Sequence, residues 1–172
     1  MQFSTVSGST SSLLSMFALC EFCDSRHTGV MRLHVEMKDS EVELRLPNDG
    51  GDLAAFLSFA NLRGFGATHP LIALADRLHD QHHVAMGPLT IFYGRDIEDD
   101  EDAEKLEKAW QPAGPLADSL DSVCTAFETD VQVLALARRA DAGGLEAQLD
   151  AVRTFSRGAA LTGKAVRLSF SE

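Results

Sequence analysis

The chain has 172 residues, with 15 lysines and arginines against 26 aspartates and glutamates, and a formal net charge of −11. Its length fits about one domain, and a hydrophobic content of 45% is sufficient for a buried core. The acidic balance argues against nucleic acid and anionic membranes as partners, since both attract basic surfaces, and no apolar run approaches the roughly 18 residues of a membrane helix.

The first element that we expect is a buried helix over residues 13–23, where apolar residues follow a Ser/Thr run that can cap it. Cys20 and Cys23, near His27, have a spacing found in metal and redox sites. A zinc site needs about four ligands, however, and a redox CxxC motif opens a helix rather than closing one. We therefore interpret both cysteines as buried, reduced thiols. The lack of a basic N-terminal stretch, which precedes the core of a signal peptide, indicates a cytoplasmic protein.

Residues 30–46 carry the clearest local pattern in the sequence. Apolar and polar residues alternate from Met31 to Met37 and again from Val42 to Leu46, on either side of a short polar turn. A period of two on both sides of such a turn predicts a β-hairpin with one face on a core. Strong turn residues, Pro47 to Gly51, close the hairpin.

Helical patterns dominate the remainder of the chain. Residues 52–62 predict one helix, and Pro70 opens another; in the second, Leu71, Leu74, Ala75 and Leu78 form one apolar stripe. The patterns predict further helices over 116–127 and 145–155, and strands over 89–93 and 166–170, whereas 131–137 fits either a strand or a helix.

Together these elements predict an α+β fold, in which helices pack on one face of an antiparallel sheet that contains the central hairpin. We divide the chain into an α+β region (1–94), an acidic and proline-containing connector (95–115) and a helix-rich region ending in a strand (116–172), within one compact domain. Seven acids between residues 96 and 104 account for much of the imbalance, since the net charge without them would be −4. Such a run is typical of a solvated surface, and it also suggests an inhibitor of a basic partner.

One set of residues has metal-ligand spacing. His79 and His83 are four residues apart, and Asp76 is three residues before His79, so on a helix all three would share a face. The alternative interpretation is a polar helix end, where protonated histidines favour the dipole. A divalent transition metal bound by Asp76, His79 and His83, with His69 or His34 in support, is therefore an alternative to a protein without cofactors.

No complete catalytic motif is present in the sequence. The glycines around Phe65 lack the later residues of a phosphate loop, and no Gly-x-Ser-x-Gly elbow occurs. Scattered serines and histidines cannot be assembled into a triad without coordinates. The sequence therefore favours a protein that is not an enzyme.

Three short patterns resemble the PatA N-terminal-like (PATAN) regulatory domain of bacteria. These are the leucine-containing helix at 13–19, the Thr-Gly-x-x-x-Leu strand at 28–33 and the Gly-rich turn into Leu53-Ala54-Ala55 at 49–55. The resemblance spans residues 8–94. It implies a bacterial signalling module that makes protein contacts and has no catalytic residues to transfer.

We accordingly expect a regulatory protein-interaction module without enzymatic activity. Apolar residues are plentiful for a single small core, so some should form a surface patch, and such patches often mark interfaces. Phe56, Phe59, Leu62 and Phe65 are the candidates, and they predict a homodimer built around residues 53–66. The identity of any protein partner does not follow from the sequence.

Overall fold

The computed structural model describes residues 31–64 and 69–171. The strands are β1 (Arg32–Met37), β2 (Glu43–Leu44), β3 (Phe92–Gly94), β4 (Gln111–Pro112) and β5 (Ala165–Ser171). The α-helices are α1 (Gly51–Ala60), α2 (Pro70–His82), α3 (Asp100–Lys108), α4 (Ala113–Thr129), α5 (Val131–Arg139) and α6 (Leu145–Leu161), and two short 3-10 helices are η2 (Pro47–Gly50) and η3 (Gly87–Thr90). None of the described helices is long and apolar enough to cross a membrane.

The strands form one sheet with the order β2-β1-β5-β3, and β4 pairs with the beginning of β5. The predicted hairpin is confirmed as the antiparallel pair β1 and β2, with Val35 opposite Leu44. The C-terminal strand β5 lies beside β1 over six residue pairs. Only β3 among the described strands runs parallel to its neighbour, β5, and this pair departs from the antiparallel sheet that the sequence predicts.

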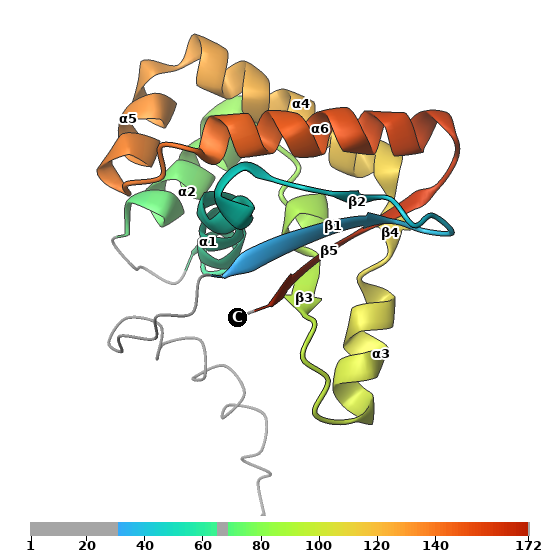
Figure 1. Ribbon diagram of the computed structural model, residues 1–172. Coiled ribbons are helices and arrows are strands. Elements are labelled where there is room, and N and C mark those ends of the chain that lie inside the picture. Colours follow the sequence, from blue (N-terminus) through green and yellow to red (C-terminus); the bar gives the residue numbers. More distant parts are fainter. Residues whose placement is uncertain (1–30, 65–68, 172) are drawn as a thin grey trace, which may run out of the picture.

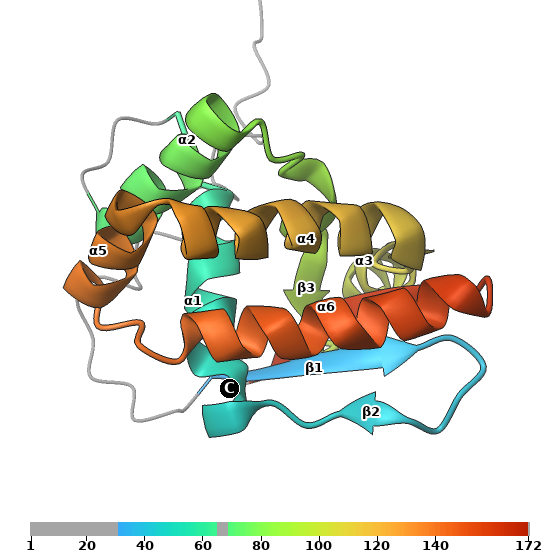
Figure 2. The same cartoon turned by 90° about the horizontal axis from the view of Figure 1, so that it is seen from above.

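Helices cover one face of the sheet, as predicted for the α+β fold. In Figure 1, α4 and α6 lie above the strands, and Figure 2 shows the two helices side by side, with α6 the nearer one to β1. Leu33 and Val35 of β1 and Val166 and Leu168 of β5 point into this layer and are buried. The alternation therefore directs the intervening residues of both strands to the opposite face.

The helical predictions after residue 50 are confirmed with small shifts at the ends. The apolar stripe of α2 is buried, and so is the predicted face of α4 from Leu116 to Phe127. The ambiguous stretch 131–137 belongs to helix α5, which Asp130 caps through a hydrogen bond from the Gln132 N–H. The helix expected over residues 13–23 lies outside the described residues.

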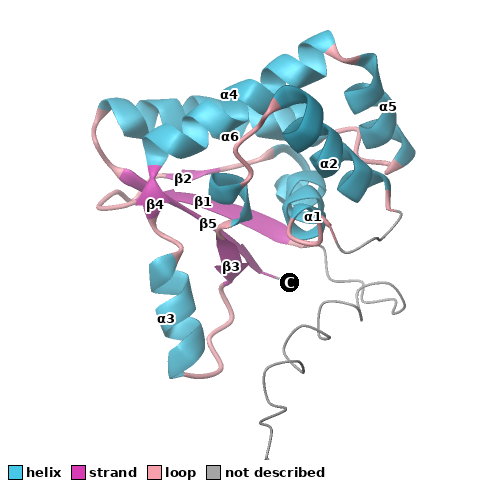
Figure 3. Cartoon of the chain, turned by 180° about the vertical axis from the view of Figure 1, so that it is seen from behind, coloured by secondary structure: helices cyan, strands magenta, loops and turns pink. Residues whose placement is uncertain are grey.

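The range that we expected to be a connector, 95–115, contains ordered elements. It includes helix α3, strand β4 and the start of α4. Figure 3 shows that α3 stands apart from the other helices, on the far side of the sheet from α4 and α6. The strand expected over 89–93 is shorter than predicted, because Gly87–Thr90 forms the 3-10 helix η3 and β3 begins only at Phe92.

A buried glutamine on α6, Gln148, joins this helix to the start of α1 and to η2. The Leu53 N–H donates to Gln148 Oε1 at 2.8 Å, and Gln148 Nε2 donates to the Pro47 carbonyl at 2.9 Å. Next to it, the Gly144 N–H donates to Asp52 Oδ2 at 2.7 Å. These bonds satisfy an N-terminal N–H of α1, which has no partner inside its own helix.

These hydrogen bonds predict that removing the side-chain amide of Gln148 lowers the free energy of unfolding. We expect Gln148→Leu, which keeps most of the side chain's volume, to lower the free energy of unfolding by about 1–3 kcal/mol, because it leaves the buried Leu53 N–H without a partner. Denaturant unfolding measures the change. Gln132→Leu, at an exposed position on α5, is the control and should change it by less than about 0.5 kcal/mol; equal losses in both variants would contradict the proposed contribution of Gln148.

Candidate functional site

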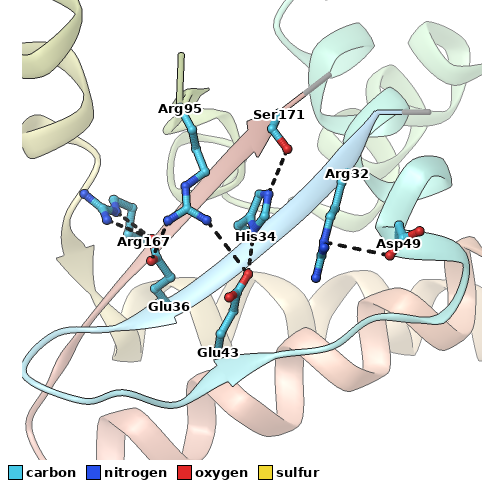
Figure 4. Close-up of polar contacts among 8 residues, drawn as sticks. All are labelled: Arg32, His34, Glu36, Glu43, Asp49, Arg95, Arg167 and Ser171. Atoms are coloured by element: carbon cyan, nitrogen blue, oxygen red, sulfur yellow. Dashed lines mark hydrogen bonds and ion pairs between the residues drawn. The ribbon is translucent and has the colours of Figure 1, made fainter. Parts of the chain in front are cut away.

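The sheet face opposite α4 and α6 carries a cluster of charged and hydroxyl side chains, which we call the polar sheet face. Its members come from three strands, the loop after β3 and η2, and Figure 4 shows them together. They are Arg32, His34 and Glu36 on β1, Glu43 on β2, Asp49 in η2, Arg95 after β3, and Arg167 and Ser171 on β5.

Glu36 holds two arginines at one end of this face. Its Oε2 accepts from Nε and Nη2 of Arg167 at 3.0 and 2.8 Å, and its Oε1 accepts from Nη2 of Arg95 at 3.0 Å. The Arg167 guanidinium also lies 4.5 Å from the centre of the Trp110 ring. Charge-assisted bonds and ring stacking of this kind fix the orientation of arginine side chains.

His34 is at the centre of the polar sheet face and contacts a side chain through each ring nitrogen. Its Nδ1 lies 2.5 Å from Glu43 Oε1, and its Nε2 lies 2.9 Å from Ser171 Oγ. The hydrogen bond with His34 lowers the pKa of Glu43, with smaller contributions from the charges of His34, Arg95 and Arg32. Glu43 is therefore an ionised acceptor above its usual pKa.

When His34 is neutral, the ionised state of Glu43 determines the direction of both hydrogen bonds. A carboxylate has no proton to donate, so in neutral His34 the proton is on Nδ1 and points to Glu43. Nε2 then carries the lone pair, and the Ser171 hydroxyl donates to it. The three side chains form a relay in which a hydroxyl, an imidazole and a carboxylate are joined in series; we call it the His34 relay.

A second feature, the acidic arm, comprises residues 96–108 and includes α3. It has eight acidic residues and two lysines, a net charge of −6. Lys105 pairs with Glu101 and Asp102, and Lys108 pairs with Glu104. Asp99 caps α3 by accepting from the Asp102 N–H at 2.9 Å. Three further acids make no ion pair within the described residues, namely Asp96, Glu98 and Asp100.

Two large apolar residues are exposed at the base of the acidic arm. Ile97 is 58% exposed, and Tyr93 on β3 is 38% exposed. Every residue from 96 to 101 is exposed as well, whereas Leu106 anchors α3 by its burial. An apolar centre with a charged border is the usual composition of a protein–protein contact surface.

The predicted metal ligands are not brought together. Within residues 31–64 and 69–171 there is no group of three or more His, Cys, Asp or Glu residues placed to hold a metal ion. His79 Nδ1 instead bonds with the adjacent Asp80 at 2.7 Å. His83 caps the end of α2 in the left-handed conformation, with φ of 53°, so the helical spacing from Asp76 and His79 does not extend to it. His69 caps the start of α2 and stacks on the Phe59 ring.

His82, rather than His83, joins a charged cluster. Its Nε2 lies 2.9 Å from Asp130 Oδ2, and the same oxygen accepts from Arg77 Nε at 2.6 Å. The hydrogen bond from Arg77, followed by that from His82, holds the pKa of Asp130 well below its usual range. Because Asp130 caps α5, this cluster ties α2 to α5, and it has a structural role.

The other sequence candidates separate into core and surface residues. Cys20 and Cys23 lie outside the described residues, whereas Cys124 is buried and burial raises its thiol pKa. Of the predicted interface, Phe56 has no exposed area and belongs to the core, which corrects its assignment to a surface patch. Phe59 and Leu62 are half-buried, and Phe65 lies outside the described residues. A homodimer around 53–66 therefore stays a prediction.

Comparison with known proteins does not assign the chain to a family. No protein-family model matches the chain, and neither curated proteins nor solved structures give a match. The resemblance of residues 8–94 to the PATAN domain thus stays a prediction.

The Asp130 cluster predicts an acid-dependent contribution to stability. Asp130→Asn keeps the helix cap but removes the charge that Arg77 and His82 contact. A carboxyl whose pKa is depressed by folding stabilises the protein above its unfolded pKa of about 4 and loses that effect as the pH falls toward the folded pKa. We therefore expect the wild type to melt above the variant at pH 6, with a difference that shrinks by pH 2.5.

Thermal unfolding followed by circular dichroism measures this difference. Asp118→Asn is the control, because Asp118 is exposed and makes no ion pair in the described part of the chain; its melting difference should not change with pH. A difference for Asp130→Asn that is as large at pH 2.5 as at pH 6 would contradict the role of the charge.

Proposed function

We propose that the protein is a regulatory protein-interaction module that binds a basic partner protein through the acidic arm. The observation that carries the proposal is the projection of α3 from the sheet, on the side away from α4 and α6 (Figure 1), with the arm's net charge of −6. A projecting charged element attracts an oppositely charged surface and accelerates encounter.

Helix stability alone does not account for these acids. Asp100, Glu101 and Asp102 lie in the first turn of α3, where negative charge favours the helix dipole. Asp96 and Glu98 precede the helix, however, and gain nothing from the dipole in its first turn. Their exposure beside Ile97 supports a contact surface with an apolar centre, rather than a merely solvated charge run.

The partner's chemistry follows from this composition. A surface rich in lysine or arginine with an apolar pocket for Ile97 would complement the arm, and the arm would confer specificity and association rate more than affinity. A cytoplasmic location is part of the proposal, since three cysteines are a sparse and odd set for an oxidising compartment. The metal-dependent alternative has no specific observation in its favour, and elemental analysis of the purified protein tests it.

The arm variant Asp96→Asn/Glu98→Gln/Asp100→Asn tests the proposal, since it leaves the Asp99 cap and all ion pairs of α3 intact. We expect the wild-type chain, immobilised and incubated with extract of its native cell, to retain a basic protein at 100 mM salt. Binding of that protein, purified and measured by surface plasmon resonance, should be about tenfold weaker for the arm variant and weaker for the wild type at high salt.

The matched control neutralises three exposed acids elsewhere, Asp118→Asn/Glu128→Gln/Glu146→Gln, which changes the net charge equally. It should bind like the wild type. Equal weakening by both triple variants would indicate a net-charge effect rather than a surface on the arm. Retention of no basic protein, or binding that the arm variant leaves unchanged, would refute the proposal.

A further inference from the structure

The His34 relay has the connectivity of a nucleophile, a base and an orienting acid. Ser171 Oγ lies 2.9 Å from His34 Nε2, and the opposite ring nitrogen lies 2.5 Å from Glu43. Both distances are within hydrogen-bond reach, which is the geometric requirement for proton transfer from a serine to a general base. The carboxylate holds the imidazole in the tautomer that can accept the serine proton.

The base of the His34 relay is more buried than its serine. The His34 side chain is only 10% exposed, so its ring is fixed and shielded between its neighbours. Ser171 is half-buried at the end of β5. The serine end of the relay is therefore less enclosed than the base.

A cationic residue lies opposite Ser171 in the sheet. Arg32 is the direct partner of Ser171 in the pairing of β1 with β5, and side chains of paired residues stand on the same face about 5 Å apart. The Arg32 side chain is 48% exposed, and its Nε lies 3.8 Å from Asp49 Oδ1. In Figure 4, His34 lies between Arg95 and Arg32. The guanidinium points to Asp49 in the structure, and because the long Arg32 side chain is half-exposed it can turn toward a negative charge that develops next to Ser171.

We propose that Ser171 is a nucleophile activated by His34, and that the polar sheet face hydrolyses esters of small carboxylic acids. Ser171 Oγ forms a bond to the ester carbonyl carbon and gives its proton to His34 Nε2, and Arg32 contacts the carbonyl oxygen as it becomes negative. The carbon–oxygen bond to the alcohol then breaks, and the alcohol leaves with the proton from His34. Water repeats the sequence on the acyl-serine, releasing the acid and restoring Ser171.

Glu43 is a positioning residue in this scheme, because it touches only His34 and its neighbours. The activity is separate from binding at the acidic arm, since none of the relay residues belongs to the arm. It also differs from the expectation of a protein without enzymatic activity.

The test treats the full-length protein with a fluorophosphonate probe and locates the adduct by peptide mass spectrometry, with hydrolysis of p-nitrophenyl acetate as a second readout. We expect the adduct on Ser171, no labelling of Ser171→Ala at that peptide, and labelling about 100-fold slower in His34→Gln. Glu43→Gln should slow labelling, and Glu43→Asp should restore part of the rate. Arg32→Gln should slow ester hydrolysis while circular dichroism shows an unchanged fold.

Ser122→Ala is the matched control, because the exposed Ser122 hydroxyl donates to the Asp118 carbonyl and has no histidine partner. It should be labelled and hydrolyse ester like the wild type. Wild-type protein without an adduct on Ser171 after prolonged exposure to excess probe would overturn the proposal, and this result does not depend on any variant folding. Labelling at the same rate in folded His34→Gln, or in urea-unfolded wild type, would overturn it as well.

Discussion

The pairing of β1 with β5 is the contact on which the rest of the structure depends. Six residue pairs, from Arg32 with Ser171 to Met37 with Val166, join strands from opposite ends of the described chain. β5 also pairs with β3 and β4, and β1 pairs with β2. Every described strand therefore reaches the sheet through these two, and α4 and α6 pack on the apolar face that they share.

The same pairing produces the polar sheet face. Alternation along β1 and β5 sends Leu33, Val35 and Leu168 to the helices and His34 and Glu36 to the other side. On that side Glu36 lies directly opposite Arg167, and His34 lies diagonally to Ser171. A shift of one residue in register would bury the charges and expose the core residues. The hydrophobic core thus fixes the register of the strands, and the register places the polar side chains next to one another on an open sheet face.

Local patterns predicted most elements, and long-range contacts explain what they could not predict. The alternation at 30–46 and the apolar stripe of α2 are local signals, and both elements form. The partner of β5 is not encoded locally, so the contact between His34 and Ser171, 137 residues apart, had no signal beyond a histidine and a serine on outward positions of two strands. The metal prediction assumed helical spacing through His83, and the backbone departs from that spacing because the left-handed His83 ends the helix.

Completion of the His34 relay is coupled to completion of the fold. Glu43 and His34 are close in sequence and can meet once the hairpin forms, but Ser171 arrives only when β5 inserts between β1 and β3. That step closes a loop of more than 130 residues, so it carries the largest loop-closure entropy among the strand pairings. The Ser171 hydroxyl therefore meets its base only after the sheet is complete. An unfolded or partly folded chain holds the same three side chains without their connection, so the reactivity that we assign to Ser171 is a property of the assembled sheet rather than of any segment of it.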